Sequence, residues 1–463
     1  MARCGSAPSC IAVSCALIAG AAVLAPSQGS AQTLGDALAR AYATNPVLLA
    51  ARARLRGVDE EIAQAVSGWR PTVSVSTQAG KRYSDSSGGS SSSAGAQNRT
   101  PRTSSLTVEQ NLFSGLQTVA ATRQAEMEIQ AERARLMRTE QSVMLDAATA
   151  YMDVVRDQAV LRLNINNEKV LRRQLEATRD RFQVGEVTRT DVAQAEARLA
   201  RATADRIGSE GVLTSAQASY RRQVGDAAGR LQQPRPLDRL PANEAEAVSL
   251  AQARNPAVFA ARFDEAAARA AVDVARSDLY PTFDIEGELS RRDQASSPTS
   301  RTDSAEITAR LKVPLYQSGS VASKVRQAKQ AAAEERGNVD AAIRAAVESA
   351  TQAWDALQTA RARIKAFTAE VRASTIALEG VQQDARVGSR TVLDVLDAEQ
   401  ELLDGRVNLV RAARDEVVAS FRLRATVGTL TARMLNLKVN IYDFAAHYRA
   451  TRNRFFGIGI GGE

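Results

Sequence analysis

Apolar residues recur every seven positions through long stretches of this chain that contain no proline. Between residues 320 and 385, the repeating positions are Ala350, Leu357, Ile364, Val371 and Leu378. A seven-residue apolar repeat is typical of helices that pack side by side along a seam. At about 1.5 Å per residue, a helix of this extent is about 100 Å long, more than a single globular core needs. The pattern predicts long helices at about residues 116–182, 188–228, 320–385 and 390–430.

A period of two residues replaces the helical period after each of two prolines. Val73 and Val75 alternate with polar residues after Pro71, and the same alternation follows Pro281. The pattern predicts strands at about residues 71–80, 103–113, 281–290 and 304–316, with polar loops at 81–102 and 291–301. Strands of about ten residues with one apolar face suit a tilted crossing of an outer membrane. A solvent-exposed hairpin in a periplasmic protein is the simpler alternative.

The two halves of the chain are copies of one unit of roughly 200 residues, because matched landmarks follow in the same order. The pairs are Asn45-Pro46 with Asn255-Pro256, Arg70-Pro71-Thr72 with Tyr280-Pro281-Thr282, Phe113-Ser114-Gly115 with Tyr316-Gln317-Ser318-Gly319, and Val184-Gly185 with Val387-Gly388. The chain therefore divides into a leading segment (1–31), a first repeat (32–232), a proline-rich linker (233–242), a second repeat (243–435) and a tail (436–463). Four strands cannot close a barrel, and lipid does not tolerate an open strand edge, so membrane insertion requires an oligomer.

Composition and charge agree with a protein of long packed helices. Aromatic residues make up only 4% of the chain, and the formal net charge is +8. Arginine alternates with acidic residues along the helical stretches, which indicates a solvated helix surface, with a basic patch facing a partner as the alternative. No basic block of five residues occurs, and we expect no nucleic-acid partner.

Residues 1–31 have the features of a secretory signal peptide. Arg3 precedes an apolar run from Ile11 to Leu24, and small residues follow before position 32. All three cysteines lie in this segment, so the mature chain would contain none and could form no disulfide. Lipid attachment at Cys15 is the alternative, although Val13-Ser14 is a poor context for it.

Motifs for catalysis or cofactor binding are missing from the sequence. There is no phosphate-binding glycine loop, no paired-histidine metal motif and no serine–histidine–aspartate setting. His447 is the single histidine, and we interpret it as a packing or surface residue. We therefore expect no enzyme activity, no cofactor and no metal site.

The duplicated pattern resembles the TolC-type outer membrane efflux and secretion channels. The residues that carry the resemblance are Asn45-Pro46, Pro71, Phe113-Ser114-Gly115, Val184-Gly185, Thr190-Asp191, Leu315-Tyr316, Gly319 and the stretch from Val387 to Ala398. The resemblance implies a mainly α-helical protein with a membrane β-barrel, in which a homotrimer forms twelve strands and a twelve-helix periplasmic tunnel. It also implies a Gram-negative outer membrane location, with a long periplasmic extension.

The same resemblance implies partners and a function. The partners are outer membrane lipid, a periplasmic adaptor (membrane fusion protein), and an inner-membrane ABC or proton-driven transporter. The tail from Leu437 to Gly457 is similar to that of members paired with type I protein secretion. The expected function is a passive exit duct for type I protein secretion, drug efflux or both. The alternative is a periplasmic coiled-coil adaptor or scaffold that does not enter the membrane.

Site residues are expected at the two turns that join the long helices. By resemblance, Asp394 and Asp397 would form rings of carboxylates at the periplasmic entrance, where mutual repulsion raises the pKa of some members. The simpler interpretation is acidity that favours a helix N-terminus. The turns themselves would dock the adaptor through Val184, Gly185, Val387, Gly388 and Ser389.

Arg390 matches a family arginine that reaches a neighbouring turn, and Thr190 and Asp191 match its partners. Such a link would lock the entrance shut, whereas an isolated surface pair is worth less than about 1 kcal/mol. One departure weakens the match, because Ala385 stands where the family often has a tyrosine. The lock could then be looser, or use Arg386 or Arg181 instead.

Overall fold

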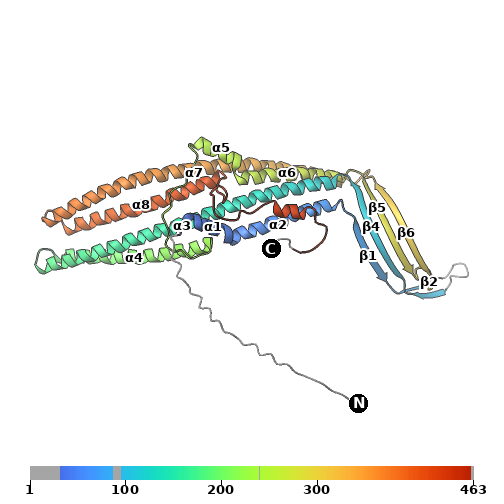
Figure 1. The fold of residues 1–463 in the computed structure, drawn as a ribbon, viewed down its shortest axis with the longest axis horizontal. Coiled ribbons are helices and arrows are strands. Elements are labelled where there is room, and N and C mark those ends of the chain that lie inside the picture. Colours follow the sequence, from blue (N-terminus) through green and yellow to red (C-terminus); the bar gives the residue numbers. More distant parts are fainter. Residues whose placement is uncertain (1–31, 87–94, 239, 460–463) are drawn as a thin grey trace, which may run out of the picture.

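The protein is an elongated molecule with two helical hairpins at one end and a sheet at the other (Figure 1). The computed structural model describes residues 32–86, 95–238 and 240–459. The expected signal segment and its three cysteines lie outside the described residues. Within those residues the duplicated, mainly α-helical fold class is confirmed, since each repeat contributes one long helical hairpin and two strands of a four-stranded sheet.

Two antiparallel hairpins of very long helices form the rod. Their helices are α3 (Gln117–Gln183) with α4 (Arg189–Val224), and α7 (Ser320–Arg386) with α8 (Val392–Thr426). Helices α3 and α7 contain 67 residues each. Their seams contain many small residues; Ala350, Ala353 and Ala360 are buried around Leu357. Alanine at these positions lets neighbouring helix axes approach closely.

The repeated Asn-Pro pair ties two helices together in each repeat. Helices α2 (Pro46–Ser67) and α6 (Pro256–Ser277) both begin at this proline. Asn45 accepts a hydrogen bond from the Val47 amide at 2.9 Å and donates one to the Gln223 carbonyl at 3.0 Å. The Asn255 side chain repeats both bonds, reaching the carbonyl of Thr426. Each asparagine thus caps one helix and satisfies a free carbonyl near the end of another.

Four strands form one antiparallel sheet in the order β1-β4-β5-β6. Their bounds are Thr72–Ala79 for β1, Arg102–Ser114 for β4, Thr282–Asp293 for β5 and Arg301–Lys312 for β6. The register gathers apolar residues on one face, among them Val73, Val75, Leu106, Val108, Ile285, Leu289, Ile307 and Leu311. Serines, threonines, glutamates and Asp284 occupy the other face. Among the described strands, β1 and β6 are the edges of this sheet.

The segment expected as a flexible loop after the first strand contains a second small sheet. Strands β2 (Arg82–Ser86) and β3 (Gly95–Arg99) pair with each other in antiparallel register. Residues 87–94 of this predicted loop lie outside the described residues. None of the helices in the described part of the chain is long and apolar enough to cross a bilayer.

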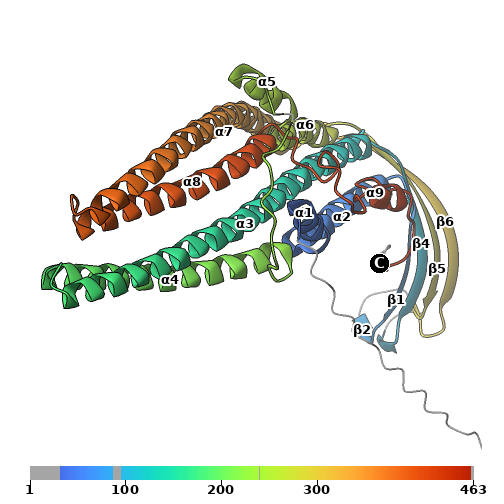
Figure 2. The ribbon, with the colours of Figure 1, turned by 60° about the vertical axis from the view of Figure 1, so that its left-hand side comes forward.

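The largest core lies midway along the rod, at a level that we call the belt. There helix α1 (Leu34–Thr44) packs on α3 of the first repeat, and α5 (Glu244–Arg254) packs on α7 of the second (Figure 2). The buried Tyr151 hydroxyl donates to the carbonyls of Gln32 and Gln232, at 2.8 and 2.6 Å. One side chain of α3 therefore fastens both ends of the first repeat.

The tail runs from this belt back toward the sheet. Its helix α9 (Ala446–Thr451) packs on α2, and Tyr448 lies against Ile62 and Ile129. His447 Nδ1 lies 3.3 Å from the fully buried carboxylate of Asp59, whose pKa is raised chiefly by burial. His447 is therefore a packing residue that helps to fasten the tail.

Candidate functional site at the helix tips

Both hairpins end in the same tight turn, and its shape follows from the Val-Gly pair. Gly185 and Gly388 have φ values of +81° and +80°, a left-handed conformation that glycine adopts without strain. The amides of Glu186 and Ser389 then donate to carbonyls one turn back, at 2.9 and 3.0 Å. This bond pattern closes the end of each helix. The preceding valine side chains are exposed at the tip of each hairpin.

The returning helices α4 and α8 begin with matching capping boxes. The Asp191 amide donates to the Thr188 hydroxyl, and the Asp191 carboxylate accepts from the Thr188 amide at 2.8 Å. Thr391 and Asp394 repeat this exchange, with the carboxylate 2.9 Å from the Thr391 amide. These reciprocal bonds stabilise the first turn of a helix.

The capping bonds change the electrostatics of Asp394. Hydrogen bonds from Thr391, together with the nearby Arg390 guanidinium, hold the pKa of this carboxyl below its ordinary value. Asp394 is therefore ionised in the protomer at neutral pH. The expected rise from repulsion within a ring concerns three copies together, and it stays a prediction.

The structure leaves the expected lock residues apart within one protomer. In the described part of the chain, Arg390 makes no hydrogen bond or ion pair with Thr190 or Asp191, and the Asp191 carboxylate accepts from Thr188. The link was expected toward a neighbouring turn, so it stays a prediction for the assembled protein. Ala385 contributes its backbone carbonyl to the turn, accepting from the Gly388 amide at 3.3 Å.

A contact that the sequence did not reveal joins the two hairpins near their tips. Arg198 of α4 pairs with Asp397 of α8. Just beside it, Leu396 packs with Leu171 and Ala202 in a small buried cluster. The two charged residues are 199 positions apart, so no local pattern could have paired them. Asp397, expected as a ring carboxylate, is thus also one half of a tie between the hairpins.

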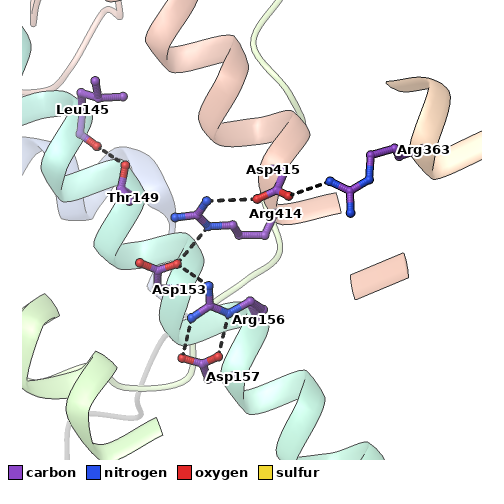
Figure 3. A network of polar contacts seen from close by, with 8 residues as sticks. All are labelled: Leu145, Thr149, Asp153, Arg156, Asp157, Arg363, Arg414 and Asp415. Carbon is purple, nitrogen blue, oxygen red and sulfur yellow. Dashed lines mark hydrogen bonds and ion pairs between the residues drawn. The ribbon is translucent and has the colours of Figure 1, made fainter. Parts of the chain in front are cut away.

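A second group of contacts, a network of ion pairs around Asp153, connects the two repeats at the level of the belt (Figure 3). The Asp153 carboxylate on α3 forms ion pairs with the guanidinium groups of Arg414 on α8 and of Arg156, and each N–O distance is 2.9 Å. Arg156 also binds Asp157 through two nitrogens, at 2.7 and 2.9 Å. Bidentate arginine–carboxylate pairs are among the stronger surface contacts and fix geometry. The network therefore holds α8 against α3 where the two hairpins begin to separate.

Between the tip contact and this network lies an open, polar groove of about 700 Å³. Its walls come from α3 and α4 on one side and α8 on the other, and they include Asn164, Arg201, Asp205, Gln400, Asp404 and Arg411. The hairpins of one protomer are therefore fastened at two levels, with this open groove between them.

Glu399 is an unusual buried acid near the tip. Its side chain is only 9% exposed, and its Oε2 has no hydrogen-bond partner among the described residues. Burial raises its pKa, against smaller opposing effects of Gln382 and Arg173. The tip therefore contains a carboxyl group whose charged form is destabilised by burial.

Comparison with known proteins explains the doubled architecture. A family model described as "Outer membrane efflux protein" matches residues 37–226 and residues 247–429. The two matched ranges fall within the two repeats seen in the fold. The chain belongs to the outer membrane efflux protein family. The expected resemblance is thereby confirmed.

Relatives of this efflux protein share most of its length. It is 32% identical to the outer membrane efflux protein BepC of Brucella suis biovar 1 (strain 1330), over 96% of each chain. It is 24% identical to the outer membrane protein TolC of Escherichia coli (strain K12), over 88% of this chain and 85% of TolC. The proteases secretion protein PrtF of Dickeya chrysanthemi is 27% identical, over 88% of this chain and 91% of PrtF.

A solved structure of the Campylobacter jejuni outer membrane channel CmeC has the same fold. Its TM-score is 0.77 at 15% identity, over 91% of this chain and 89% of that chain. The efflux protein is therefore an outer membrane channel with a helical periplasmic part, and the adaptor alternative is set aside. The family consists of channels and not of enzymes, in agreement with the expectation from the sequence.

Proposed function

We propose that three copies of this efflux protein form a passive exit duct of a tripartite export system. The observation that carries the proposal is the combination, in one protomer, of a two-faced sheet with two open edges and a rod of long helices. Three such sheets would give a barrel of twelve strands, and three rods a tunnel of twelve helices. The energy for transport would come from an inner-membrane ABC or proton-driven transporter, joined through a periplasmic adaptor at the exposed turns.

The internal duplication supplies a template for how neighbouring copies would meet. Within one protomer, β4 of the first repeat pairs with β5 of the second, and Phe113 lies opposite Phe283. Tyr316 is the counterpart of Phe113. Val73 is the counterpart of Phe283, because each directly follows the first threonine of its strand. The same register would therefore place Tyr316 of one copy opposite Val73 of the next. This pairing would cover both open edges and close the ring.

The helix tips would form the gate of the duct. Asp394 and Asp397 from three copies would surround the entrance and favour cations. Arg390 would reach Thr190 and Asp191 of a neighbouring copy, and the Arg198–Asp397 tie would hold the two hairpins of each copy together. Each contact is modest by itself, but three acting together would bias the entrance toward its closed state.

Secreted protein is the cargo class that we propose first. The support is the tail that resembles type I secretion members, together with the relative named as a proteases secretion protein. Small-molecule efflux is the second candidate, because the relative from Brucella suis is named an efflux protein.

Single-channel recording in a planar bilayer tests the duct and its gate. The purified protein should give cation-selective openings, and Asp394→Ala/Asp397→Ala should lose this selectivity. Arg390→Ser should enlarge or prolong the openings, because the proposed lock is removed. A folded protein that never inserts would disprove the duct, and openings unchanged by either variant would disprove the gate assignments.

Ring closure is tested separately by a cysteine pair, Val73→Cys with Tyr316→Cys. The sequence after residue 31 contains no cysteine, so the engineered pair has no competitor once the signal segment is removed. Oxidation should produce covalent dimers and trimers on a denaturing gel. Monomers alone would rule out the proposed register.

A further inference from the structure

An aromatic segment of the tail stands exposed at one edge of the protomer, where helix α2 gives way to strand β1. Phe456 and Ile458 are 91% and 105% exposed, and Phe455 is 66% exposed. Such exposure is unusual for three large apolar side chains within four residues. Phe456 and Ile458 are thus almost wholly uncovered by the described part of this copy.

The segment is held at this edge by Arg70, the last residue before Pro71. The Arg70 guanidinium donates to the Arg454 carbonyl at 2.7 Å and lies 4.1 Å from the centre of the Phe455 ring. Arg454 in turn donates to the Phe456 carbonyl at 3.3 Å. The tail is therefore fastened beside the first residues of β1.

The opposite edge of the protomer has a second exposed apolar group at the matching level. Leu315 and Tyr316, just beyond β6, are 93% and 86% exposed. Phe113, the counterpart of Tyr316 at the end of β4, lies opposite Phe283 of the other repeat and is only 39% exposed. A β-carbon added to Gly115 would meet the Ser277 carbonyl at 2.6 Å and the Tyr280 side chain at 3.0 Å. Gly319 is the counterpart of Gly115, and a β-carbon there would meet nothing within 4 Å.

The duplication therefore indicates what fills the space at Gly319. Tyr280 of the second repeat corresponds to Arg70 of the first. Tyr280 touches the turn that follows β4, so Arg70 should touch the matching turn after β6 of a second copy. Arg70 is also the residue that holds the tail. The exposed tail segment of one copy and the exposed Leu315–Tyr316 pair of the next are thus brought together at the seam, which is the boundary between the two copies.

We propose that the tail segment 454–458 packs across the seam between two copies of this chain, against Leu315 and Tyr316 of the neighbouring copy. This inference rests on the proposed trimer, and it adds a contact outside the sheet and helices. Its energy comes from burying apolar surface that both partners otherwise expose to water. Arg70 acts as a positioning residue, because it fixes the tail and does not itself supply the apolar contact.

Cross-linking tests the contact on the full-length protein in the outer membrane. Phe456→Cys combined with Leu315→Cys, treated with a short bismaleimide, should give covalent dimers and trimers. A matched control is Ile441→Cys with Leu315→Cys, since Ile441 is an exposed tail residue nearer the belt. Because proximity sets the effective concentration of the two thiols, we expect roughly tenfold more cross-linked chains from the first pair. Equal yields from the two pairs would overturn the proposal.

Two further variants separate the tail contact from ring closure. Adding Arg70→Gln to the Phe456/Leu315 pair should abolish the tail cross-link, while the Val73/Tyr316 pair still forms covalent trimers in that background. If the Val73/Tyr316 pair gives no covalent product even with Arg70 in place, the proposed strand pairing between copies is wrong, and the tail contact must be judged by its own cross-link. A chain that ends at Asn453 should form trimers that dissociate at a lower temperature on semi-denaturing gels.

A lipid-facing tail is the competing outcome. A bimane label on Phe456→Cys would then be quenched by brominated phospholipid in reconstituted bilayers. Strong quenching without cross-linking would overturn the seam contact, whereas cross-linking with weak quenching supports it.

Discussion

Single residues at the ends of helices decide how closely the elements of this molecule approach one another. Gly428, just after α8, has φ of +78°, and a β-carbon there would lie 2.1 Å from the Arg254 carbonyl oxygen. No side chain can be accommodated at that distance unless the backbone moves. The position therefore combines a left-handed turn with a close backbone approach, and both require glycine.

Gly428→Ala should destabilise the protein by at least about 1–3 kcal/mol per protomer, because strain and overpacking add. The measurement is the temperature at which the purified protein unfolds in detergent. Gly208→Ala is the matched control, since this glycine is in the middle of α4 and a β-carbon there would meet nothing within 4 Å. The control should be neutral or stabilise by about 0.5–1 kcal/mol. Equal losses in both variants would contradict the close-approach argument.

Glu399 gives a pH-dependent prediction at the same scale. Burial raises its folded-state pKa above the usual 4.5, so the folded protein binds this proton more tightly than the unfolded chain does. Stability from this group is therefore full below pH 4.5 and is lost as pH rises through the folded pKa. At neutral pH the whole penalty is present.

Glu399→Gln removes the charge and should raise the melting temperature at pH 7 to 8, by the equivalent of about 1 kcal/mol per protomer. The gain should disappear near pH 4, where the wild-type carboxyl is protonated. Glu401→Gln, on the exposed face of the same helix, should show neither effect. A gain at pH 7 that persists unchanged at pH 4 would argue against burial as its cause.

At the scale of elements, the Asn-Pro junction links helices that are distant in sequence. Asn45 caps α2 and also bonds to a carbonyl 178 residues away, so one side chain performs two tasks. Asn45→Ala should cost about 1–3 kcal/mol per protomer in thermal unfolding.

Asn45→Asp separates the two tasks of this residue. The aspartate keeps the capping acceptor, but it places a carboxylate against the Gln223 carbonyl. A loss as large as that of Asn45→Ala would show that the bridge to α4 matters. Full stability of the aspartate variant would mean that capping alone accounts for the role. Asn338→Ala, which removes only a surface bond to Glu335, serves as the control.

The sequence revealed those features of the fold that repeat or that depend on near neighbours. The heptad seam, the alternation after Pro71 and the Val-Gly turns all follow from local periodicity and turn chemistry. The duplication then predicted the order of the elements. The small β2–β3 sheet was missed, because its strands are polar and short and lack an apolar face.

The site was less predictable than the fold for a physical reason. The capping roles of Asp191 and Asp394 could be anticipated from their spacing, since each is three residues after a threonine. The Arg198–Asp397 and Asp153–Arg414 pairs could not, because their partners lie 199 and 261 positions apart. Such pairs depend on how two hairpins pack, and a single sequence contains no periodic signal for that.

At the scale of the whole molecule, the two levels of fastening determine how the hairpins can move. The network around Asp153 fixes α8 at the belt, and the Arg198–Asp397 pair holds it near the tip. Breaking the Arg198–Asp397 pair alone should let one hairpin move at its tip, while the Asp153 network still holds α8 at the belt.

Arg198→Gln should therefore lengthen or enlarge channel openings in a planar bilayer. It also frees the Asp397 carboxylate, so selectivity for cations should be kept or increased. Asp397→Asn should likewise ease opening, because the same tie is lost, but it should reduce selectivity. Identical selectivity in the two variants would show that Asp397 does not face the conduction path.

The open edges of the sheet have a consequence for the life of a newly made copy. Until β1 and β6 find neighbours, each chain presents unpaired backbone groups and apolar strand faces to its surroundings. Such a chain is a target for aggregation and for proteases. If it assembles as the proposed trimer, its survival depends on how fast it meets two other copies. Substitutions that weaken the seam should therefore appear first as a shortage of protein in the cell envelope, and only afterwards as a leaky or closed channel.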